Sequence, residues 1–396
     1  MSAFFSHIVA PYSVEDFYNT YHEKDILHVS RNNANYYNNI LTSKEISDFL
    51  DRRDIFYPSL RIVKNGKELP MGEYTKKGVP IGHHKKDGVI HTEKAFALFN
   101  AGSTLVIQGG QRYFDNLSKC CLHLSNNFSS PVQANLYITP NKSQGFNPHW
   151  DTHDVFVLQI SGTKTWQLYG FEKELPTKSQ SFVSKGYDKK PIQTLQLSPG
   201  DFLYVPRGYV HDAMADDGIS AHITIGILSY TWARFFTEAF PQLEEFKEFR
   251  EAVPFWKGEE LHTLVKEKLE VLKEKINQLD FNKSISRLSA NHNKMQAQPV
   301  NNYFQSLLDI DRISSTSVFG LNEAVIYTIK KEEDTLKIAY LDKAISLPAN
   351  AETIIDTMFE KKVFSFNDLP DHLPEENKKA FVRQLIKEGM IYVKQL

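Results

Sequence analysis

The sequence predicts an α+β protein whose centre is an antiparallel double-sheet jelly roll, also called a double-stranded β-helix. Between residues 132 and 228, short stretches alternate between apolar and polar residues and are separated by Gly, Pro and Ser turns. The chain then changes to charged segments whose apolar residues lie three and four positions apart, which favours helices. We therefore expect three domains: a barrel with N-terminal helices over 1–236, a helical region over 237–317, and a winged-helix-like domain over 318–396.

The composition is that of a water-soluble protein with a sizeable core. Its 396 residues are 41% hydrophobic and 24% charged, and the net charge of −2 gives no reason to expect nucleic acid or a membrane surface as a partner. The two cysteines, Cys120 and Cys121, are adjacent and form no spaced pair for a disulfide framework. The N-terminus lacks the pattern of a secretion signal, so we expect a cytoplasmic location.

Short helices are expected before the barrel. In "TSKEISDFLDRR" Thr42 is a candidate N-cap with Glu45 three residues later, the pattern of a capping box. Residues 91–110 are typical of a helix that ends at Gly102 and is followed by a strand, and a second helix is expected in "YFDNLSKCCLHLSNNF". The strands of the barrel are then predicted at 132–139, 154–160, 165–171, 194–198, 201–206 and 220–228.

The helical region carries an apolar stripe in "GEELHTLVKEKLEVLKEKINQLDF". Two interpretations of the stripe remain open, a helix packed on its own domain and a subunit interface. The residues of the stripe are Leu261, Leu264, Val265, Leu269, Leu272 and Ile276. Residues 289–302, "SANHNKMQAQPVNN", are polar and are expected to form a connector.

The last part of the chain, from about residue 318, is expected to run strand, strand, helix, short strand, helix, and the second helix ends at Gly389 before a final strand. This order is winged-helix-like. Many winged helices bind DNA, but here Lys and Arg are balanced by Asp and Glu, whereas a DNA-reading helix needs a basic surface. A structural or protein-binding role is favoured, and no direct nucleic-acid contact is expected.

The stretch "GFNPHWDTHDVF" holds the first candidate metal ligands. If it is a strand, His149, Asp151 and His153 share one face and Asp154 lies on the other. An imidazole and a carboxylate two residues apart can bind one metal ion, and a histidine from another strand completes a face of an octahedron. Two histidines and one carboxylate leave three open positions and suit non-haem Fe(II), with room for a chelating cosubstrate and O2.

The completing histidine is predicted in "LSPGDFLYVPRGYVHDA". There Pro206 to Gly208 turn the chain so that His211 faces into the barrel. The expected metal ligands, which are also the catalytic residues, are therefore His149, Asp151 and His211. His153 is expected to support the site through hydrogen bonds, and Asp154 is expected to be structural or to face solvent.

A basic residue is expected beside such a metal when the cosubstrate is 2-oxoglutarate, because its distal carboxylate must be neutralised inside the barrel. Lys164 begins a strand in "SGTKTWQLYG", although it could also face solvent at the strand end. Asn135 and Tyr137 are two residues apart and share one face of their strand, so they could line the same pocket, as could Thr224; these three are further candidates for cosubstrate binding. A plain core or rim role is the alternative for these three.

Taken together, these motifs resemble the JmjC-type ribosomal oxygenases, a family with cupin-like bacterial members. The resemblance is carried by "NLYITP", "SQGFNPHWDTHDVFVLQISGTKTWQLYG", "LSPGDFLYVPRGYVHDA" and "HITIGI". By position it implies iron ligation by His149, Asp151 and His211 and assigns the carboxylate-binding basic residue to Lys164. It also implies a dioxygenase that hydroxylates a histidine or arginine of a ribosomal protein, and a homodimer formed through the helical region.

One departure from the family affects the substrate. The arginine hydroxylases of the family carry Arg where this chain has Lys164, so the substrate of those members does not transfer. The precursor peptide of a ribosomally made natural product is an alternative substrate. Two other classes also remain: a metal-dependent cupin acting on a small molecule without 2-oxoglutarate, and a regulator that uses the winged helix. Residues 143–146 and 178–190 are candidates for the substrate rim.

Overall fold

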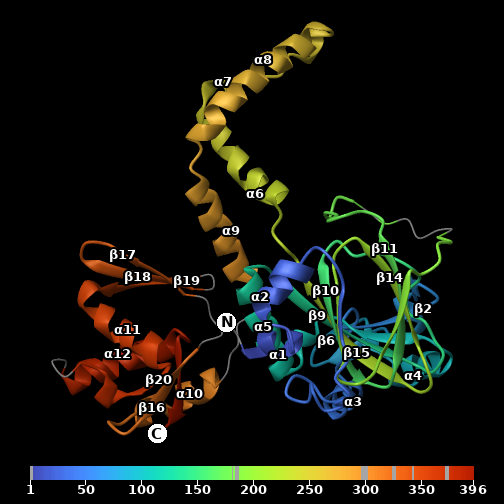
Figure 1. Ribbon diagram of the computed structural model, residues 1–396. Helices are drawn as coiled ribbons and strands as arrows, with labels where there is room; N and C mark the ends of the chain where they lie inside the picture. The colour runs from blue at the N-terminus through green and yellow to red at the C-terminus, as the bar shows by residue number, and fades with distance from the viewer. Residues whose placement is uncertain are drawn as a thin grey trace.

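The computed structural model describes residues 3–180, 182, 187–295, 302–322, 327–340, 343–370 and 374–396. Figure 1 shows a barrel formed by the first part of the chain, a helical arm that extends away from it, and a C-terminal domain. Within these described ranges, no helix combines the length and the apolar character needed to cross a membrane.

Two antiparallel sheets form the barrel and confirm the predicted jelly roll. The larger sheet has the order β1-β13-β10-β15-β9-β8-β2-β3, and the smaller sheet has the order β12-β11-β14. The strands of the larger sheet are β1 (Leu27–Val29), β2 (Leu60–Lys64), β3 (Lys67–Glu68), β8 (Thr104–Ile107), β9 (Val132–Thr139), β10 (Asp154–Ser161), β13 (Phe202–Val205) and β15 (Ser220–Ile227). Those of the smaller sheet are β11 (Lys164–Phe171), β12 (Gln193–Leu197) and β14 (Tyr209–Ala215).

Strand β10 shows how the period of two builds the core. Phe156 and Leu158 pack on one face of the larger sheet with the N-terminal helices, while Val155 and Val157 pack on the other face between the two sheets. Since both faces are covered, β10 is buried along nearly its whole length. This central strand follows directly on the segment with the candidate metal ligands.

The helices that cover the larger sheet agree with the predictions. They are α1 (Ala3–Val9), α2 (Val14–Asp16), α3 (Ser43–Leu50), α4 (Thr92–Asn100) and α5 (Asp115–Phe128). Thr42 and Glu45 form the predicted capping box at the start of α3. Small strands between β3 and α4 form two hairpin-like pairs that were not predicted: β4 (Thr75–Lys76), β5 (Val79–Ile81), β6 (His84–Lys86) and β7 (Val89–Ile90).

The arm, residues 232–295, contains α6 (Trp232–Ala239), α7 (Lys247–Arg250), α8 (Glu260–Lys275) and α9 (Phe281–Met295). It begins at Trp232, a few residues before the predicted boundary. The predicted connector was wrong in its first half, because residues 289–295 continue α9. Residues 296–301 lie outside the described ranges.

The C-terminal domain has its own core, which includes Phe319, Ile355 and Leu385. Its two helices are α11 (Glu352–Lys361) and α12 (Glu375–Lys387), and α10 (Tyr303–Asp309) precedes the first strand. The sheets are β20-β16-β21 and β17-β18-β19. Their strands are β16 (Val318–Leu321), β17 (Tyr327–Lys331), β18 (Thr335–Tyr340), β19 (Lys343–Pro348), β20 (Val363–Ser365) and β21 (Ile391–Gln395). The order helix, short strand, helix and final strand is the expected one, but four strands and not two precede α11. The winged-helix character of the domain stays a prediction.

Candidate metal and cosubstrate site

His149 and His211 lie side by side because their backbones pair. The N–H of His149 donates to the carbonyl oxygen of His211 at 3.0 Å, and the N–H of His211 donates to that of His149 at 2.8 Å. His211 belongs to β14, while His149 lies in the loop before β10. The two imidazole centroids are 4.7 Å apart.

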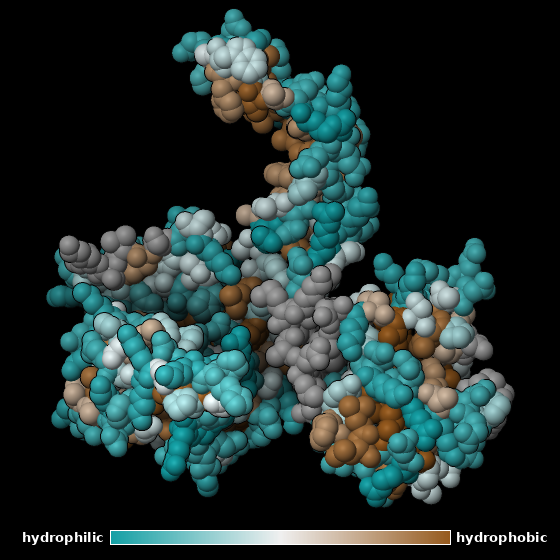
Figure 2. All heavy atoms as spheres, turned by 180° about the vertical axis from the view of Figure 1, so that it is seen from behind, coloured by the Kyte–Doolittle hydropathy of each residue, from teal (hydrophilic) through white to brown (hydrophobic). Residues whose placement is uncertain are grey.

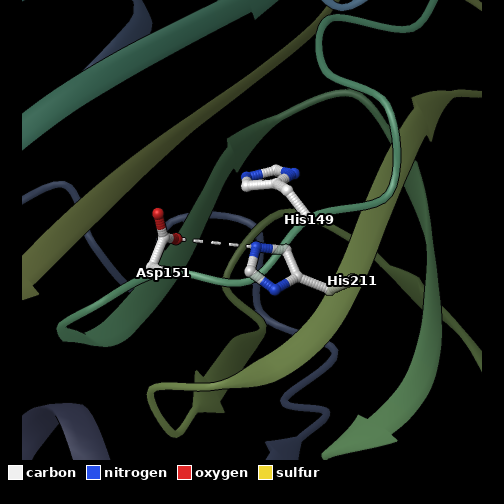
Figure 3. Close-up of side chains that lie close together, drawn as sticks. All are labelled: His149, Asp151 and His211. Carbon is white, nitrogen blue, oxygen red and sulfur yellow. Dashed lines mark ion pairs between the residues drawn. The ribbon is translucent and has the colours of Figure 1, made fainter. Parts of the chain in front are cut away.

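Asp151 completes the group from the same loop. Its Oδ2 lies 3.8 Å from Nε2 of His211, and Figure 3 shows the three side chains converging. One candidate ligand atom from each residue lies within 4.8 Å of the others. The expectation that this run is a strand was wrong: β10 begins only at Asp154, so alternation along a strand does not orient Asp151. The backbone carbonyl of Asp151 instead accepts a hydrogen bond of 3.0 Å from the N–H of Gly208.

Both imidazoles are oriented for metal binding through Nε2. Nδ1 of His149 lies 2.8 Å from the carbonyl oxygen of Asn147, and Nδ1 of His211 lies 3.0 Å from that of Tyr209. Such carbonyl partners take the Nδ1 proton and leave Nε2 free as a ligand. Burial lowers the pKa of His211 to about 4, so its ring is neutral, as a metal ligand must be. Two imidazole nitrogens and one carboxylate oxygen therefore fit one face of the coordination octahedron of a divalent metal ion.

The turn before β14 requires a glycine. Gly208 has φ +85°, and a Cβ there would lie 1.8 Å from the carbonyl oxygen of Lys173. Its N–H is also the donor that holds Asp151. The Pro206–Gly208 segment therefore fixes two of the three candidate ligands at once, since His211 follows it on β14.

Beyond the ligands lies an inner cavity of about 60 Å³, which also contains Lys164. This volume holds roughly four to six water molecules, the scale of a short dicarboxylate. Lys164 is 3% exposed, and its Nζ donates to Oγ1 of Thr139 at 3.0 Å. Among the described residues it has no carboxylate partner within ion-pair distance, and burial lowers its pKa to about 7. A buried cation of this kind calls for an anionic ligand.

Two further polar side-chain atoms without a partner line the inner cavity. In the described part of the chain, Nε1 of Trp166 and Nδ1 of His222 are buried and have no hydrogen-bond partner. His222 stacks on Tyr137 with ring centroids 5.1 Å apart, and burial together with the Lys164 charge holds the pKa of His222 well below its usual value. Neither residue was predicted as a site residue. Their strand positions were predicted, but which residues of β11 and β15 face each other across the barrel depends on the packing of the two sheets.

An outer cavity of about 340 Å³ opens on the other side of His149 and Asp151. Tyr137 and Thr224 line both cavities, whereas Asn135 lines only the outer one. Burial raises the pKa of Tyr137 to about 12, and the nearby Asp151 carboxylate contributes, so the phenol is neutral. The assignment of Tyr137, Thr224 and Asn135 to cosubstrate binding stays a prediction.

His153 packs against the backbone of β15. A Cβ on Gly226 would lie 2.3 Å from the His153 ring, so the glycine makes room for the imidazole. His153 lines the outer cavity and also a groove of about 650 Å³ beside α6. Its role as a supporting residue stays a prediction. Of the predicted rim, Gly145 and Phe146 line the inner cavity, and residues 181 and 183–186 lie outside the described ranges.

Asp154 is fully buried and accepts hydrogen bonds from the Tyr204 hydroxyl at 3.0 Å and from the Arg207 N–H at 3.1 Å. It is therefore structural, and the expectation that it could face solvent was wrong. His22 and Glu23 lie close enough to Asp154 for a shared cation. The Arg207 guanidinium already forms an ion pair with Glu23 there, so this cluster carries its own cation.

The fold is a cupin-type barrel, and its interior carries a candidate metal site of two histidines and one carboxylate. Residues 110–235 match the model of the JmjC domain family. That match includes all three candidate metal ligands and Lys164.

Curated relatives carry the same resemblance. The chain is 30% identical over 258 residues to the bifunctional lysine-specific demethylase and histidyl-hydroxylase NO66 of Dictyostelium discoideum, covering 62% of this chain and 48% of that protein. It is 29% identical over 264 residues to human ribosomal oxygenase 1, covering 63% of this chain and 39% of that protein. The chain thus spans less than half the length of these relatives.

Solved structures support the fold over nearly the whole chain. The Escherichia coli ribosomal oxygenase YcfD superposes with a TM-score of 0.54 at 13% identity, covering 97% of this chain and 98% of that one. A second YcfD structure, in complex with cobalt and 2-oxoglutarate, gives a TM-score of 0.51 at 13% identity, covering 96% and 98% of the two chains. At this identity the likeness shows the fold.

Proposed function

We propose that this protein is an Fe(II)- and 2-oxoglutarate-dependent oxygenase that hydroxylates a side chain of a protein or peptide. The observation that carries the proposal is the position of Lys164, a buried cation without an ion-pair partner in the described structure, in the same cavity as His149, Asp151 and His211. A metal cupin acting on a small molecule without 2-oxoglutarate has no need of this lysine.

Each residue has a definite task in this reaction. His149, Asp151 and His211 would hold the metal, and Lys164 would neutralise the distal carboxylate of the cosubstrate. Nε1 of Trp166 and the ring of His222 are placed to donate further hydrogen bonds in that cavity. When bound, Fe(II) and 2-oxoglutarate supply the activation of O2 that oxidises a substrate C–H bond, with succinate and CO2 as coproducts. The buried walls exclude bulk water from the inner cavity.

The substrate is proposed to be a polypeptide. The names of the relatives given above refer to histidyl hydroxylation and to ribosomal oxygenases, which supports a ribosomal protein as the substrate; a natural-product precursor peptide is the alternative. The outer cavity and the groove beside α6 share His153 and Leu228, so they run together past the metal ligands. A continuous open groove suits an extended chain, with one side chain entering the outer cavity.

A homodimer formed through the arm belongs to the same proposal. No residue of α8 is fully buried, which favours a subunit interface over packing on its own domain. Val265 and Leu269 of the stripe are 47% and 48% exposed, and Trp232 and Trp256 on the arm are 76% and 79% exposed. Figure 2 shows apolar atoms along the arm. Contiguous exposed apolar surface of this kind favours an interface with another chain.

The function is tested by incubating the purified protein with Fe(II), 2-oxoglutarate and O2 and measuring succinate. We expect succinate from the wild type and none from His149→Ala. In parallel, mass spectrometry of proteins from cells with the wild type and with His149→Ala should find a residue that gains one oxygen atom only with the wild type. Absence of 2-oxoglutarate turnover by the iron-loaded wild type would contradict the proposal.

A further inference from the structure

Three cavities meet beside Leu228, just after the end of β15. The outer cavity shares Leu228 with the groove beside α6 and with a cavity of about 420 Å³ along α5, which we call the α5 cavity. The α5 cavity and the groove beside α6 also share Pro131. A polypeptide can therefore pass from the α5 cavity into the groove beside α6 while one of its side chains enters the outer cavity towards His149 and Asp151.

Carboxylates are scarce in the walls of these three cavities. In the described part of the chain, neither the α5 cavity nor the groove beside α6 is lined by an Asp or a Glu, and the outer cavity is lined by Asp151 alone. Asp151 is a candidate metal ligand, so a bound metal ion would compensate its charge. The walls therefore offer a cationic residue of the substrate no free carboxylate with which to form an ion pair.

Lysine and arginine side chains, by contrast, occur in all three walls. Arg61, Arg207 and Arg234 form ion pairs with glutamates that are not part of the walls, and these pairs offset their charges. Arg112 lines the α5 cavity, and Lys178 lines the groove beside α6. Both side chains are exposed, and neither has an ion-pair partner among the residues that the structure describes. These two charges are therefore available to a ligand.

Backbone contacts place Arg112 at the boundary between the α5 cavity and the outer cavity. A Cβ on Gly109, which has φ +67°, would lie 3.8 Å from Nε and Nη1 of Arg112, so the guanidinium lies over this glycine. The N–H of Gly109 donates to Oδ1 of Asn135 at 3.0 Å, and Asn135 lines the outer cavity. A carboxylate next to the side chain that enters the outer cavity can therefore reach Arg112.

Lys178 lines the groove beside α6 from a closed turn. The N–H of Gln180 donates to the carbonyl oxygen of Thr177, and the N–H of Thr177 donates to Oε1 of Gln180, each at 2.9 Å. Lys178 is also the first residue of the predicted rim segment 178–190. Because Lys178 lines only the groove beside α6 and Arg112 only the α5 cavity, the two free cations lie in different branches of the joined cavities.

From these walls we infer, on the basis of the proposed hydroxylase function, that the substrate polypeptide carries acidic residues on both sides of the residue that is oxidised. Arg112 pairs with a carboxylate on one flank, and Lys178 pairs with a carboxylate on the other. Flanks rich in lysine or arginine would bring like charges together in walls that have no carboxylate to compensate them, and such repulsion is a source of specificity. Arg112 and Lys178 are thus specificity-determining residues of the substrate site.

The inference is tested with peptide libraries whose central positions are randomised and whose flanks are all Glu, all Ser or all Lys. The libraries compete in one reaction with the iron-loaded full-length protein and 2-oxoglutarate, and mass spectrometry measures the added oxygen in each. At low salt we expect Glu-flanked peptides to gain oxygen at least about tenfold faster than Lys-flanked ones, since several weak ion pairs act together. At about 1 M salt, where the screening length is about 3 Å, the ratio should fall below about threefold. Equal rates at low salt, or faster oxidation of Lys-flanked peptides, would overturn the inference.

A charge-reversed variant assigns the preference to the two cations. Arg112→Glu combined with Lys178→Glu should oxidise Lys-flanked peptides at least as fast as Glu-flanked ones. Arg53→Glu combined with Lys94→Glu is the matched control and should keep the wild-type preference, because both residues are exposed cations outside the three walls and have no ion-pair partner in the described chain. Thermal unfolding shows that both double variants are folded. A wild-type preference in the folded Arg112 and Lys178 variant would overturn the assignment.

The proposed function and this inference fail in different ways. If 2-oxoglutarate is neither bound nor decarboxylated, the hydroxylase function fails and the inference fails with it. If 2-oxoglutarate is decarboxylated but no Glu-flanked peptide gains oxygen, or if the cellular residue that gains oxygen lies between basic flanks, the inference alone is overturned.

Discussion

The backbones of His149 and His211 hold each other through two hydrogen bonds, of 3.0 and 2.8 Å, although the residues are far apart in the chain. The pairing of β14 with the loop before β10 therefore fixes the positions of these two candidate ligands. Because the ligands are fixed by backbone contacts, the site should change little in shape when a metal binds.

Replacement of any one of His149, Asp151 and His211 by Ala should weaken metal binding at least about 100-fold, since even outer-shell changes cost up to that much. The measurement is titration of the apoprotein with Co(II), followed by its visible absorption. His153→Ala should retain binding within about tenfold, because His153 packs on Gly226 outside the three-residue group. If His153→Ala lowered the affinity for Co(II) as much as His149→Ala does, His153 would be a ligand as well.

Gly208→Ala should lower the free energy of unfolding by about 3 kcal/mol or more, since the new Cβ would collide with the carbonyl oxygen of Lys173 in addition to the strain of a positive φ. Gly218→Ala is the matched control: Gly218 has φ +93°, but no atom lies within 4 Å of the position that a Cβ would take there, so only about 1 kcal/mol is expected. Urea unfolding of both variants measures the difference. Equal losses would show that the close contact at Gly208 is not required.

Binding of 2-oxoglutarate should take up a proton above pH 7. Burial lowers the pKa of Lys164 to about 7 in the free protein, and a bound carboxylate favours the charged form, so the pKa rises on binding. At pH 8 we expect an uptake of about one proton, and at pH 6 almost none. Calorimetry in buffers of different ionisation enthalpy measures this uptake. Lys164→Arg should bind without uptake at pH 8, and an uptake by this variant equal to that of the wild type would place the titrating group elsewhere.

The arm should mediate dimerisation through the stripe on α8. Val265→Glu combined with Leu269→Glu should raise the dimer dissociation constant at least about tenfold, because charges would replace apolar contacts at the interface. Thr263→Glu is the control, as Thr263 lies on the opposite side of α8. Sedimentation equilibrium measures both. A monomeric wild type, or an unchanged dimer in the double variant, would exclude this interface.

Much of the fold and the metal group was predictable because the signals are local. Alternation marked β9, β10, β11 and β15, and Pro206 to Gly208 marked the turn that presents His211. The orientation of Asp151 was reached for the wrong reason: alternation along a strand was invoked, whereas a loop held by the Gly208 N–H positions the carboxylate.

The remaining parts of the site depend on contacts between distant segments. Trp166 shares a face of β11 with Lys164, but His222 of β15 meets them only when the two sheets close on each other. The burial of Asp154 depends on Tyr204 and Arg207, which lie on and after another strand. Helix α8 showed the converse: its apolar stripe was visible in the sequence, but only the structure shows that Val265 and Leu269 of this stripe are exposed.

The central claim is that Lys164 binds the distal carboxylate of 2-oxoglutarate beside a metal held by His149, Asp151 and His211. Calorimetric titration of 2-oxoglutarate into the Co(II)-loaded wild type and Lys164→Met at pH 6.5 tests it most directly. We predict binding to the wild type and a loss of at least about 100-fold for Lys164→Met with the metal retained, the cost of removing a buried charge partner. Equal affinities for the two proteins, or no binding to the wild type, would contradict the account.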